Sequence, residues 1–176
     1  MSQYLNALTR DQASPAAQQT FDDLQKKVGF LPNIYAAIGN SAVALNASLA
    51  FNAALAKGEL SARETEVIKL AASEANGCAY CVAAHSAVGQ MQGLSQEQTR
   101  AARTGTLADP KLNAVAQLTL DIVNSKGHPA PARVEAFFAA GYSKAALVEL
   151  LAFVAANTFN NYLQHLADVA VDFPAV

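Results

Sequence analysis

Two cysteines and a histidine lie close together near the middle of the chain, at spacings that suit thiol chemistry. Cys78 and Cys81 are separated by two residues, and His85 follows four residues after Cys81. Because an α-helix turns by about 100° per residue, the three side chains share one stripe of a helix that begins at Cys78. The helix dipole at such a start, together with a nearby imidazole, lowers the pKa of a thiol. The spacing therefore predicts a reactive thiol pair whose sulfurs can reach each other.

A carboxylate that orients the histidine is expected on the preceding helix. Asn76-Gly77 predicts a turn that folds the two helices back on each other as a hairpin. At about 1.5 Å per residue, Glu66 and His85 then come level within one turn of helix. A carboxylate there would hold the imidazole in position and store a proton. The helical wheel instead puts Glu74 nearer the centre of the apolar face, so spacing favours Glu66 and orientation favours Glu74.

Other uses of the same residues compete with catalysis. The two cysteines would also fit as small buried apolar side chains. A four-ligand zinc site would consist of Cys78, Cys81, His85 and Glu66. Closed zinc sites usually take a second ligand pair from elsewhere in the chain, however, and the sequence has no second CxxC or HxxxH. For Glu66, the simple alternative is an exposed ion pair with Lys69 on the same helix.

The composition indicates a single helical domain. The chain has 176 residues, 52% of them hydrophobic and 15% charged. Alanine, the best helix former, makes up roughly a fifth of the residues, which disfavours an all-β fold. The low charge and high apolar content exclude a disordered chain, and no apolar run is long enough for a membrane span. A net charge of −2 leaves no basic face for nucleic acid.

The N-terminal residues lack the basic segment followed by an apolar one that marks a secretory signal. We therefore expect a cytoplasmic protein of one domain, residues 1–176, with no bound metal or cofactor. In a reducing compartment, a close cysteine pair is more often catalytic or metal-binding than a structural cross-link.

Start and stop signals divide the chain into eight or nine helices. Serine, aspartate and proline residues mark the starts, and glycines mark most of the ends. The predicted helices run from Pro15 to Gly29, near 33–39, from Ser41 to Lys57, from Ser61 to Asn76, from Cys78 to Gln92, from Ser95 onward, from Asp109 to Ser125, from Pro131 to Ala140 and from Ser143 to Asp168. We therefore predict an all-α domain.

A weak internal similarity suggests a degenerate repeat. Ala146–His165 aligns with Glu66–His85 through four identities, which would make it a second helix pair without cysteines. Coincidence explains the alignment equally well in a chain this rich in alanine. Two further residues are candidates for the wall of a pocket at the cysteines: Tyr80, which lies between them, and His165.

The pattern Glu-x11-Cys-x-Tyr-Cys-x3-His, with Asn-Gly before the first cysteine, resembles the alkylhydroperoxidase D (AhpD)-like members of the carboxymuconolactone decarboxylase family. The resemblance is strongest over residues 61–90. The closing segment Asn-Asn-Tyr-Leu-Gln-His-Leu-Ala-Asp-Val-Ala-Val-Asp-Phe-Pro is similar to the tail of a peroxidase-related subgroup. The best-known members have a histidine directly before the second cysteine, where this chain has Tyr80.

This resemblance implies the AhpD-like helical fold and a thiol peroxidase. Cys81 would react with the hydroperoxide, Cys78 would resolve the product as a disulfide, and Glu66 with His85 would relay protons, which favours Glu66 over Glu74. It also implies homotrimers or homohexamers and a dithiol reductant, in some members a lipoyl-bearing protein. Two alternatives remain: a non-catalytic redox sensor that uses the disulfide as a switch, and a decarboxylase-like enzyme similar to the cysteine-free branch of the family.

Overall fold

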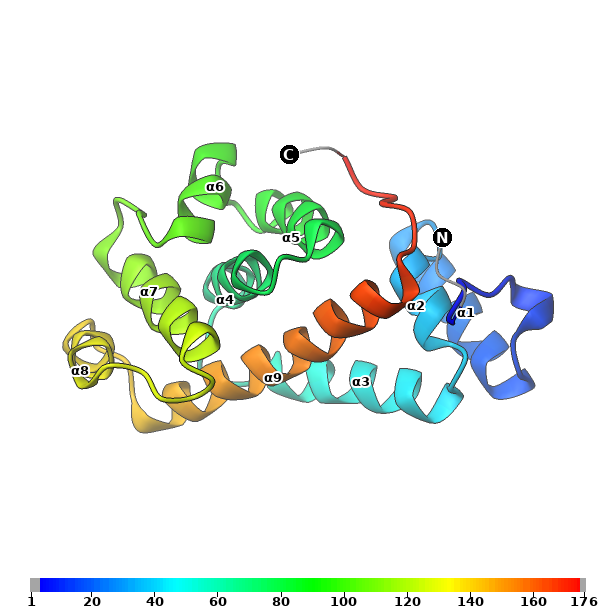
Figure 1. The fold of residues 1–176 in the computed structure, drawn as a ribbon, viewed down its shortest axis with the longest axis horizontal. Coiled ribbons are helices and arrows are strands. Elements are labelled where there is room, and N and C mark those ends of the chain that lie inside the picture. The colour runs from blue at the N-terminus through cyan, green and yellow to red at the C-terminus, as the bar shows by residue number, and fades with distance from the viewer. Residues whose placement is uncertain (1–3, 175–176) are drawn as a thin grey trace.

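The computed structural model describes residues 4–174, which form nine α-helices and one short 3₁₀ turn (Figure 1). The elements are η1 (Arg10–Gln12), α1 (Pro15–Val28), α2 (Asn33–Ile38), α3 (Ala42–Leu55), α4 (Ala62–Ala75), α5 (Ala79–Met91), α6 (Gln96–Thr104), α7 (Pro110–Asn124), α8 (Pro131–Ala139) and α9 (Lys144–Ala167). Residues 4–174 contain no strand. The predicted all-α fold is confirmed. Within the same residues, no helix combines the length and the apolar character that a membrane crossing requires.

The predicted helix ends are largely confirmed by side-chain caps. Ser61 and Glu64 form a capping box at the start of α4, where the Ser61 N–H donates to Glu64 Oε2 at 2.7 Å. Gly29 ends α1 with a φ of 91°, a left-handed conformation that glycine adopts without strain. The turn η1 was not predicted, although Thr9 and Gln12 have the same capping-box spacing.

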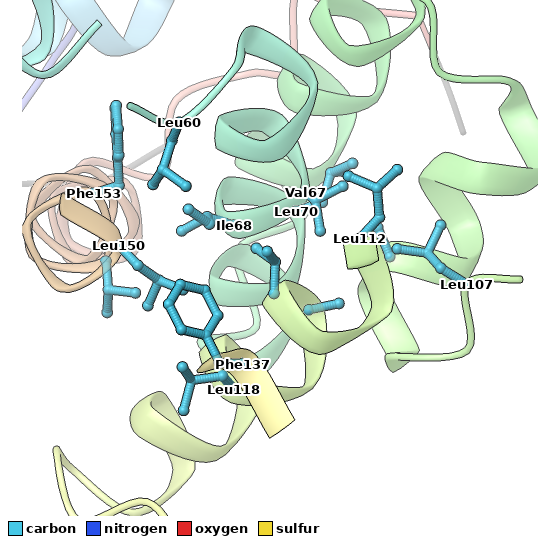
Figure 2. Close-up of a cluster of buried hydrophobic side chains, with 14 of the residues drawn as sticks. Leu60, Val67, Ile68, Leu70, Leu107, Leu112, Leu118, Phe137, Leu150 and Phe153 are labelled. Atoms are coloured by element: carbon cyan, nitrogen blue, oxygen red, sulfur yellow. The ribbon is translucent and has the colours of Figure 1, made fainter. Parts of the chain in front are cut away.

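Helix α4 is the central element of the fold and packs against α5, α6, α7 and α9. Its residues Val67, Ile68 and Leu70 are fully buried in a core that α7, α8 and α9 complete with Leu118, Phe137, Leu150 and Phe153 (Figure 2). Because α4 packs against four other helices, a polar side chain on its buried face is held in position and shielded from water. Glu66 lies on this helix.

A second buried cluster joins the first three helices to the start of α5. It includes Phe21 of α1, Ile34 of α2 and Leu45 of α3, and it also includes Cys78 and Cys81. The cysteine pair is therefore part of a packed interior and does not lie on an open surface loop.

The predicted helix-pair repeat is wrong. Residues 146–165 lie within the single unbroken helix α9, whereas residues 66–85 span α4, a turn and α5. The turn depends on Gly77, which has a φ of 69°. The aligned position in α9 is Asn157, which continues the helix, so the two segments share residue types but not structure.

Candidate active site

The turn at Gly77 brings α4 and α5 together as the predicted hairpin, and Cys78 is the N-cap residue of α5. Cys78 Sγ accepts a hydrogen bond from the Cys81 backbone N–H at 3.3 Å. The two sulfurs are joined by a disulfide. The structure thus confirms that the pair opens a helix and that its sulfurs reach each other.

Both cysteines are buried, with exposed fractions of 1% for Cys78 and 3% for Cys81, but each lines a cavity. Cys81 shares a cavity of about 190 Å³ with His85. Cys78 lines a different cavity, of about 350 Å³, together with Glu74 and Arg103. The two cysteines therefore line different cavities, although their sulfurs are bonded to each other.

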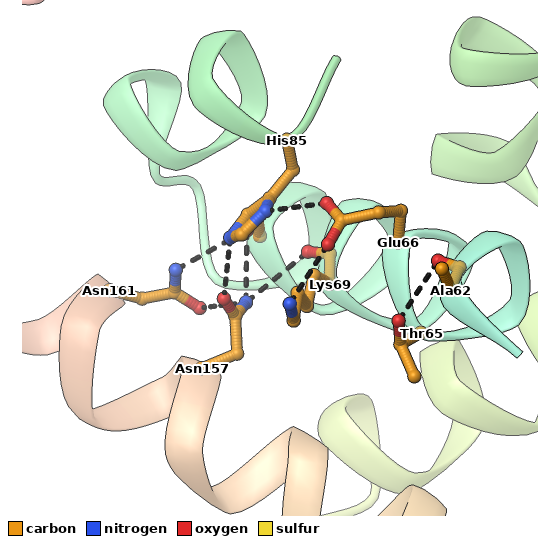
Figure 3. Close-up of polar contacts among 8 residues, drawn as sticks. Ala62, Thr65, Glu66, Lys69, His85, Asn157 and Asn161 are labelled. Carbon is orange, nitrogen blue, oxygen red and sulfur yellow. Dashed lines mark hydrogen bonds and ion pairs between the residues drawn. The ribbon is translucent and has the colours of Figure 1, made fainter. Parts of the chain in front are cut away.

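Glu66 and His85 meet across the hairpin as predicted (Figure 3). His85 Nδ1 lies 2.9 Å from Glu66 Oε2, and Lys69 Nζ donates to Glu66 Oε1 at 2.8 Å. Burial alone would raise the pKa of Glu66, but the positive charges of His85 and Lys69 outweigh it and lower the pKa to about 2. Glu66 is therefore ionised at neutral pH. The ion pair with Lys69 also exists, but it is buried and includes His85.

Glu74, the carboxylate that the helical wheel favoured, does not contact His85. It lies at the exposed end of α4, where its Oε2 accepts from Arg103 Nε at 2.7 Å. Glu74 thus pairs with a residue of α6, a different helix that packs against α4. The spacing of residues along the hairpin therefore predicted the carboxylate partner of His85 correctly, and the helical wheel did not.

Asn157 of α9 holds the other side of the His85 ring (Figure 3). Asn157 Oδ1 lies 3.1 Å from His85 Nε2. Asn157 Nδ2 donates to three acceptors: Lys69 O at 3.2 Å, Ser73 Oγ at 3.0 Å and Asn161 Oδ1 at 3.3 Å. These contacts fix the orientation of the amide, so that its oxygen faces the imidazole. Both ring nitrogens of His85 therefore face acceptors, and only the imidazolium form donates to both.

Sequence reasoning missed Asn157 and Asn161, and it treated Lys69 only as a simple surface partner. A signal was present, because residues 157, 160 and 161 are all asparagine, a poor helix former, yet they lie inside one long helix. Asparagines in a helix interior indicate that their side chains are needed for hydrogen bonds. Asn161 is fully buried and accepts from Asn76 Nδ2 at 2.9 Å, which ties α9 to the end of α4.

Tyr80 lines the cavity beside Cys81, as predicted, together with Tyr35 and Phe173. The Tyr80 hydroxyl donates to Asp172 Oδ1 at 2.7 Å and accepts from the Ile34 N–H at 3.3 Å. Burial and the hydrogen bond to Asp172 raise the pKa of Tyr80. Tyr80 is therefore a neutral phenol that connects the cysteine pair to the C-terminal segment.

His165, the other predicted pocket residue, does not line this cavity. It is exposed in the last turn of α9, and its ring centroid lies 6.3 Å from that of Tyr162. His165 follows Asn160 by five residues, which rotates it by about 140° around the helix axis, away from the face of Asn160. Its alignment with His85 carried no structural meaning.

The four residues of the alternative zinc site are paired with one another. The two sulfurs form the disulfide, and Glu66 contacts His85. Over residues 4–174, no group of three or more His, Cys, Asp or Glu side chains is arranged to hold a metal ion.

Comparison with known proteins finds a family that matches part of the chain and a fold that matches nearly all of it. Residues 42–121, which include both cysteines, Glu66 and His85, match the carboxymuconolactone decarboxylase family. No curated protein sequence matches the chain significantly.

Solved structures match nearly the whole length of the chain. An uncharacterized peroxidase-related protein with an alkylhydroperoxidase AhpD core, from Ralstonia eutropha JMP134, has 23% identity and a TM-score of 0.86, covering 97% of this chain and 92% of that protein. An uncharacterized peroxidase-related protein from Silicibacter sp. TM1040 has 20% identity and a TM-score of 0.82, covering 96% and 93%. The debrominase Bmp8, in complex with 2,3,4-tribromopyrrole, also has 20% identity and a TM-score of 0.82, covering 98% and 93%. These matches show that the fold is shared.

Proposed function

We propose that the chain is a thiol-dependent peroxidase, because residues 42–121 match the carboxymuconolactone decarboxylase family and the chain has the AhpD-like fold. Its Cys78–Cys81 pair reduces a hydroperoxide with electrons from an external dithiol. The observation that carries this proposal is that Cys81 and His85 line one cavity, with the ionised Glu66 buried behind the imidazole. A nucleophile, a proton donor and a charge that holds the donor thus lie together.

The proposed reaction proceeds in three balanced steps. The Cys81 thiolate attacks the terminal oxygen of R–O–O–H, the O–O bond breaks, and Cys81 becomes a sulfenic acid while RO⁻ takes up a proton and leaves as ROH. The Cys78 thiol attacks the sulfenic sulfur, forms the disulfide and releases water. An external dithiol then exchanges with the disulfide, returns both cysteines to thiols and leaves oxidised.

His85 supplies charge and a proton in this scheme. When the ring is protonated, both of its N–H groups have acceptors, and the imidazolium places a positive charge at the cavity where a thiolate and then an alkoxide develop. Transfer of its proton to the leaving RO⁻ completes the first step. Glu66 and Asn157 act as positioning residues, because they hold the ring and do not reach the cavity themselves.

The environment of Cys78 supports its role as the resolving cysteine. The Cys81 N–H at the start of α5 donates to Cys78 Sγ, which favours negative charge on that sulfur when the disulfide opens. The second cavity gives the reductant a separate route to Cys78, away from the space beside Cys81. A lipoyl-bearing protein is the reductant that the family resemblance implies.

A second candidate reaction is reductive debromination, favoured by the match to the debrominase Bmp8 over almost the full length of both chains. In this reaction the dithiol would again supply two electrons. The carbon–bromine bond would be replaced by carbon–hydrogen, bromide would be released, and the cysteine pair would end as the disulfide.

The two reactions are separated by turnover assays with dihydrolipoamide as reductant. We expect the wild-type protein to consume cumene hydroperoxide steadily, and Cys81→Ser to abolish consumption. Cys78→Ser should react once and accumulate the Cys81 sulfenic acid, detected by dimedone labelling and mass spectrometry. Full activity in Cys81→Ser would overturn the assignment. A wild-type protein that oxidises once and is not re-reduced would be a redox sensor, and one that acts only on 2,3,4-tribromopyrrole would be a debrominase.

A further inference from the structure

Tyr35 has a hydroxyl group that is free to bind a ligand beside the reactive cysteine. This residue of α2 lines the same cavity as Cys81 and His85. Within residues 4–174 its hydroxyl forms no hydrogen bond, whereas the hydroxyl of Tyr80 in the same wall both donates and accepts one. A phenol hydroxyl is a donor that turns toward whatever acceptor is near. Tyr35 therefore offers the cavity a hydrogen bond that the protein does not use.

The electrostatic neighbours of this hydroxyl place it on the inner side of the ring. Burial raises the pKa of Tyr35, and the negative charge of Glu66, the carboxylate that holds His85, raises it further. Burial is also the main reason that the pKa of Tyr80 is raised, and the nearby Tyr35 adds to it. A hydroxyl that is withdrawn from bulk water and lies within electrostatic reach of both groups points toward the interior that His85 and Cys81 share.

A ligand in the cavity can reach this hydroxyl, because Tyr35 is only partly buried. Three side-chain oxygens of residues 4–174 are unpaired and enclosed beyond the reach of water, and they belong to Thr119, Asn160 and Gln164. The hydroxyl of Tyr35 is unpaired but is not one of these enclosed atoms. The space beside it is therefore open to a ligand atom.

The rest of the cavity suits a small apolar group. Much of its wall consists of aliphatic and aromatic side chains, among them Val28, Val88 and Phe173. Its volume is about 190 Å³, and an apolar cavity of about 150 Å³ is sufficient to hold benzene. The space therefore fits one group of about the size of a benzene ring, with a short polar end directed at Tyr35 and His85.

The proposed reaction needs a hydrogen-bond donor that is not already engaged. When Cys81 attacks a hydroperoxide, negative charge develops on the oxygen that is bonded to carbon. A protonated His85 already directs one N–H at Glu66 and the other at Asn157, so it must break one of these bonds to deliver its proton. Tyr35 has no such bond to break. A donor that is in place before the charge develops stabilises the transition state most effectively.

We propose that Tyr35 binds the substrate, with its hydroxyl donating a hydrogen bond to the carbon-bound oxygen of R–O–O–H. This proposal rests on the proposed function and deepens it by naming the residue that holds the leaving group. When Cys81 attacks the terminal oxygen, the O–O bond breaks and its electron pair goes to the carbon-bound oxygen, where the hydrogen bond from Tyr35 becomes stronger. His85 supplies the proton that completes ROH, and Tyr35 ends the step as the neutral phenol that it was at the start.

The nature of the leaving group tests this role, with Tyr35→Phe as the variant that removes only the hydroxyl. The reduced protein is mixed with cumene hydroperoxide, which releases a strongly basic alkoxide, or with perbenzoic acid, which releases a weakly basic carboxylate. Disulfide formation is followed by acid quenching, thiol alkylation and mass spectrometry. We expect Tyr35→Phe to slow oxidation by cumene hydroperoxide about a hundredfold. Oxidation by perbenzoic acid should slow by no more than about threefold, because benzoate needs little stabilisation.

Tyr80→Phe is the matched control, because it removes a hydroxyl from the same cavity wall that is already paired with Asp172. Disturbed packing slows both oxidants equally, and this is the pattern that we expect for Tyr80→Phe. Equal slowing of both oxidants by Tyr35→Phe, or no slowing, would overturn the proposal. Tyr35→Phe should unfold at the same urea concentration as the wild type, because its hydroxyl has no partner to lose. A lower midpoint would mean that the hydroxyl is paired within the protein, which contradicts the proposal.

Binding without turnover provides a second test. The oxidised protein is titrated with 2-phenyl-2-propanol, the alcohol formed from cumene hydroperoxide, and with tert-butylbenzene, which has nearly the same shape but no oxygen. Tyr35→Phe should bind the alcohol about fivefold more weakly than the wild type, the loss of one net hydrogen bond, and the hydrocarbon equally well. In protein labelled with ¹³C at the tyrosine ζ-carbon, the resonance that is absent from Tyr35→Phe should shift further with the alcohol than with the hydrocarbon.

The two tests separate this proposal from the proposed function. Alcohol binding that depends on Tyr35, without oxidation of the cysteines by any hydroperoxide, would refute the peroxidase and leave the Tyr35 site in place. Equal oxidation of wild type and Tyr35→Phe by cumene hydroperoxide would refute the role of Tyr35 and leave the peroxidase.

Discussion

His85 is held by acceptors on both of its ring nitrogens, and this pairing determines what the residue can do. Glu66 Oε2 faces Nδ1, and Asn157 Oδ1 faces Nε2. A protonated ring can donate to both acceptors, whereas a neutral ring can donate to only one of them. The two contacts thus fix the orientation of the ring in the proposed reaction.

Glu66 links this electrostatic arrangement to the stability of the fold. Its pKa in the folded protein is about 2, below its ordinary value of 4.5, so the folded state favours the ionised form. The stabilisation is therefore fully present above about pH 4.5 and is lost as the pH falls toward 2. At neutral pH, Glu66→Gln should lower the free energy of unfolding by about 3 kcal/mol, because it removes the buried carboxylate to which the partly exposed Lys69 and His85 are paired.

This prediction is measured by urea unfolding of the oxidised protein between pH 7 and pH 3. The difference between wild type and Glu66→Gln should shrink as the pH falls, because below about pH 4.5 the carboxylate becomes protonated in the unfolded chain while it stays ionised in the folded protein. Glu74→Gln, at the exposed pair with Arg103, is the control and should change stability by less than about 1 kcal/mol. A difference that stays constant with pH would contradict the ionised, buried Glu66.

At the residue scale, the sequence predicted the contacts that follow from local geometry. The spacing of Cys78, Cys81 and His85 on one helix, and the level of Glu66 across the Asn76–Gly77 turn, are consequences of helix rise and twist. Asn157 and Asn161 could not be assigned in this way, because α9 is far away in the sequence and its approach depends on packing of the whole domain. Only their unfavourable helix propensity indicated a special use.

The C-terminal segment runs from the end of α9 past α2 toward α5 (Figure 1), and its residue Phe173 lines the cavity beside Cys81. Beyond α9, Asp172 Oδ2 accepts from the Asn33 N–H at 2.6 Å, and Asp172 Oδ1 accepts from Tyr80. The next residue, Phe173, lies edge-on to Tyr80 and Phe30 and lines the cavity that contains Cys81. One carboxylate thus fastens the segment to both α2 and α5.

Removing the two hydrogen bonds of Asp172 should make Cys81 more accessible to reagents in solution. In a Cys78→Ser background, which leaves a single thiol, Asp172→Ala should increase the rate at which N-ethylmaleimide alkylates Cys81 by about tenfold. Loss of the two hydrogen bonds should also lower the free energy of unfolding by about 1–3 kcal/mol. Asp11→Ala, at an exposed aspartate of η1, is the control. An alkylation rate unchanged by Asp172→Ala would show that Phe173 does not restrict access to Cys81.

The helices could be predicted from the sequence, whereas the position of the C-terminal segment after α9 could not. Capping serines and terminating glycines act locally, so Ser61, Gly29 and Ser143 marked helix ends correctly. The segment after α9 has no regular hydrogen-bond pattern of its own. Its position depends on contacts of Asp172 with residues 92 and 139 positions away, which no local signal specifies.

Exposed apolar side chains gather on α3 and α9. We propose that this apolar surface packs against further copies of the chain. Phe51 and Phe159 line a groove of about 430 Å³ between these helices, and both are exposed. Val43, Tyr162 and Leu166 on the same two helices are also exposed. Apolar surface of this extent is typical of an interface, and homotrimers or homohexamers are what the family resemblance implies.

Light scattering after gel filtration tests this assembly. The wild-type protein should elute as a trimer or hexamer, and Phe51→Glu should dissociate it, because a charge in an apolar interface loses its hydration. Lys57→Glu, a control at an exposed position just beyond α3, should leave the assembly intact. A monomeric wild-type protein would contradict the proposal.

In the proposed reaction, the cavity of Cys81 takes the hydroperoxide and the cavity of Cys78 takes the reductant, and α5 carries a small residue at each. Ala79 lines the cavity of Cys78, and Ala84 lines the cavity of Cys81. Ala79→Phe should slow reduction of the disulfide by dihydrolipoamide by about tenfold or more and leave oxidation by cumene hydroperoxide unchanged. Ala84→Phe should slow oxidation by a similar factor and leave reduction unchanged.

The two half-reactions are measured separately by acid quenching, thiol alkylation and mass spectrometry, and each variant is the control for the other. Both substitutions add the same aromatic ring to the same helix, so a general loss of stability would slow both steps in both variants. Opposite effects on the two steps are expected only if each sulfur is reached from its own cavity. Slowing of the same step by both variants would mean that the hydroperoxide and the dithiol enter through one opening.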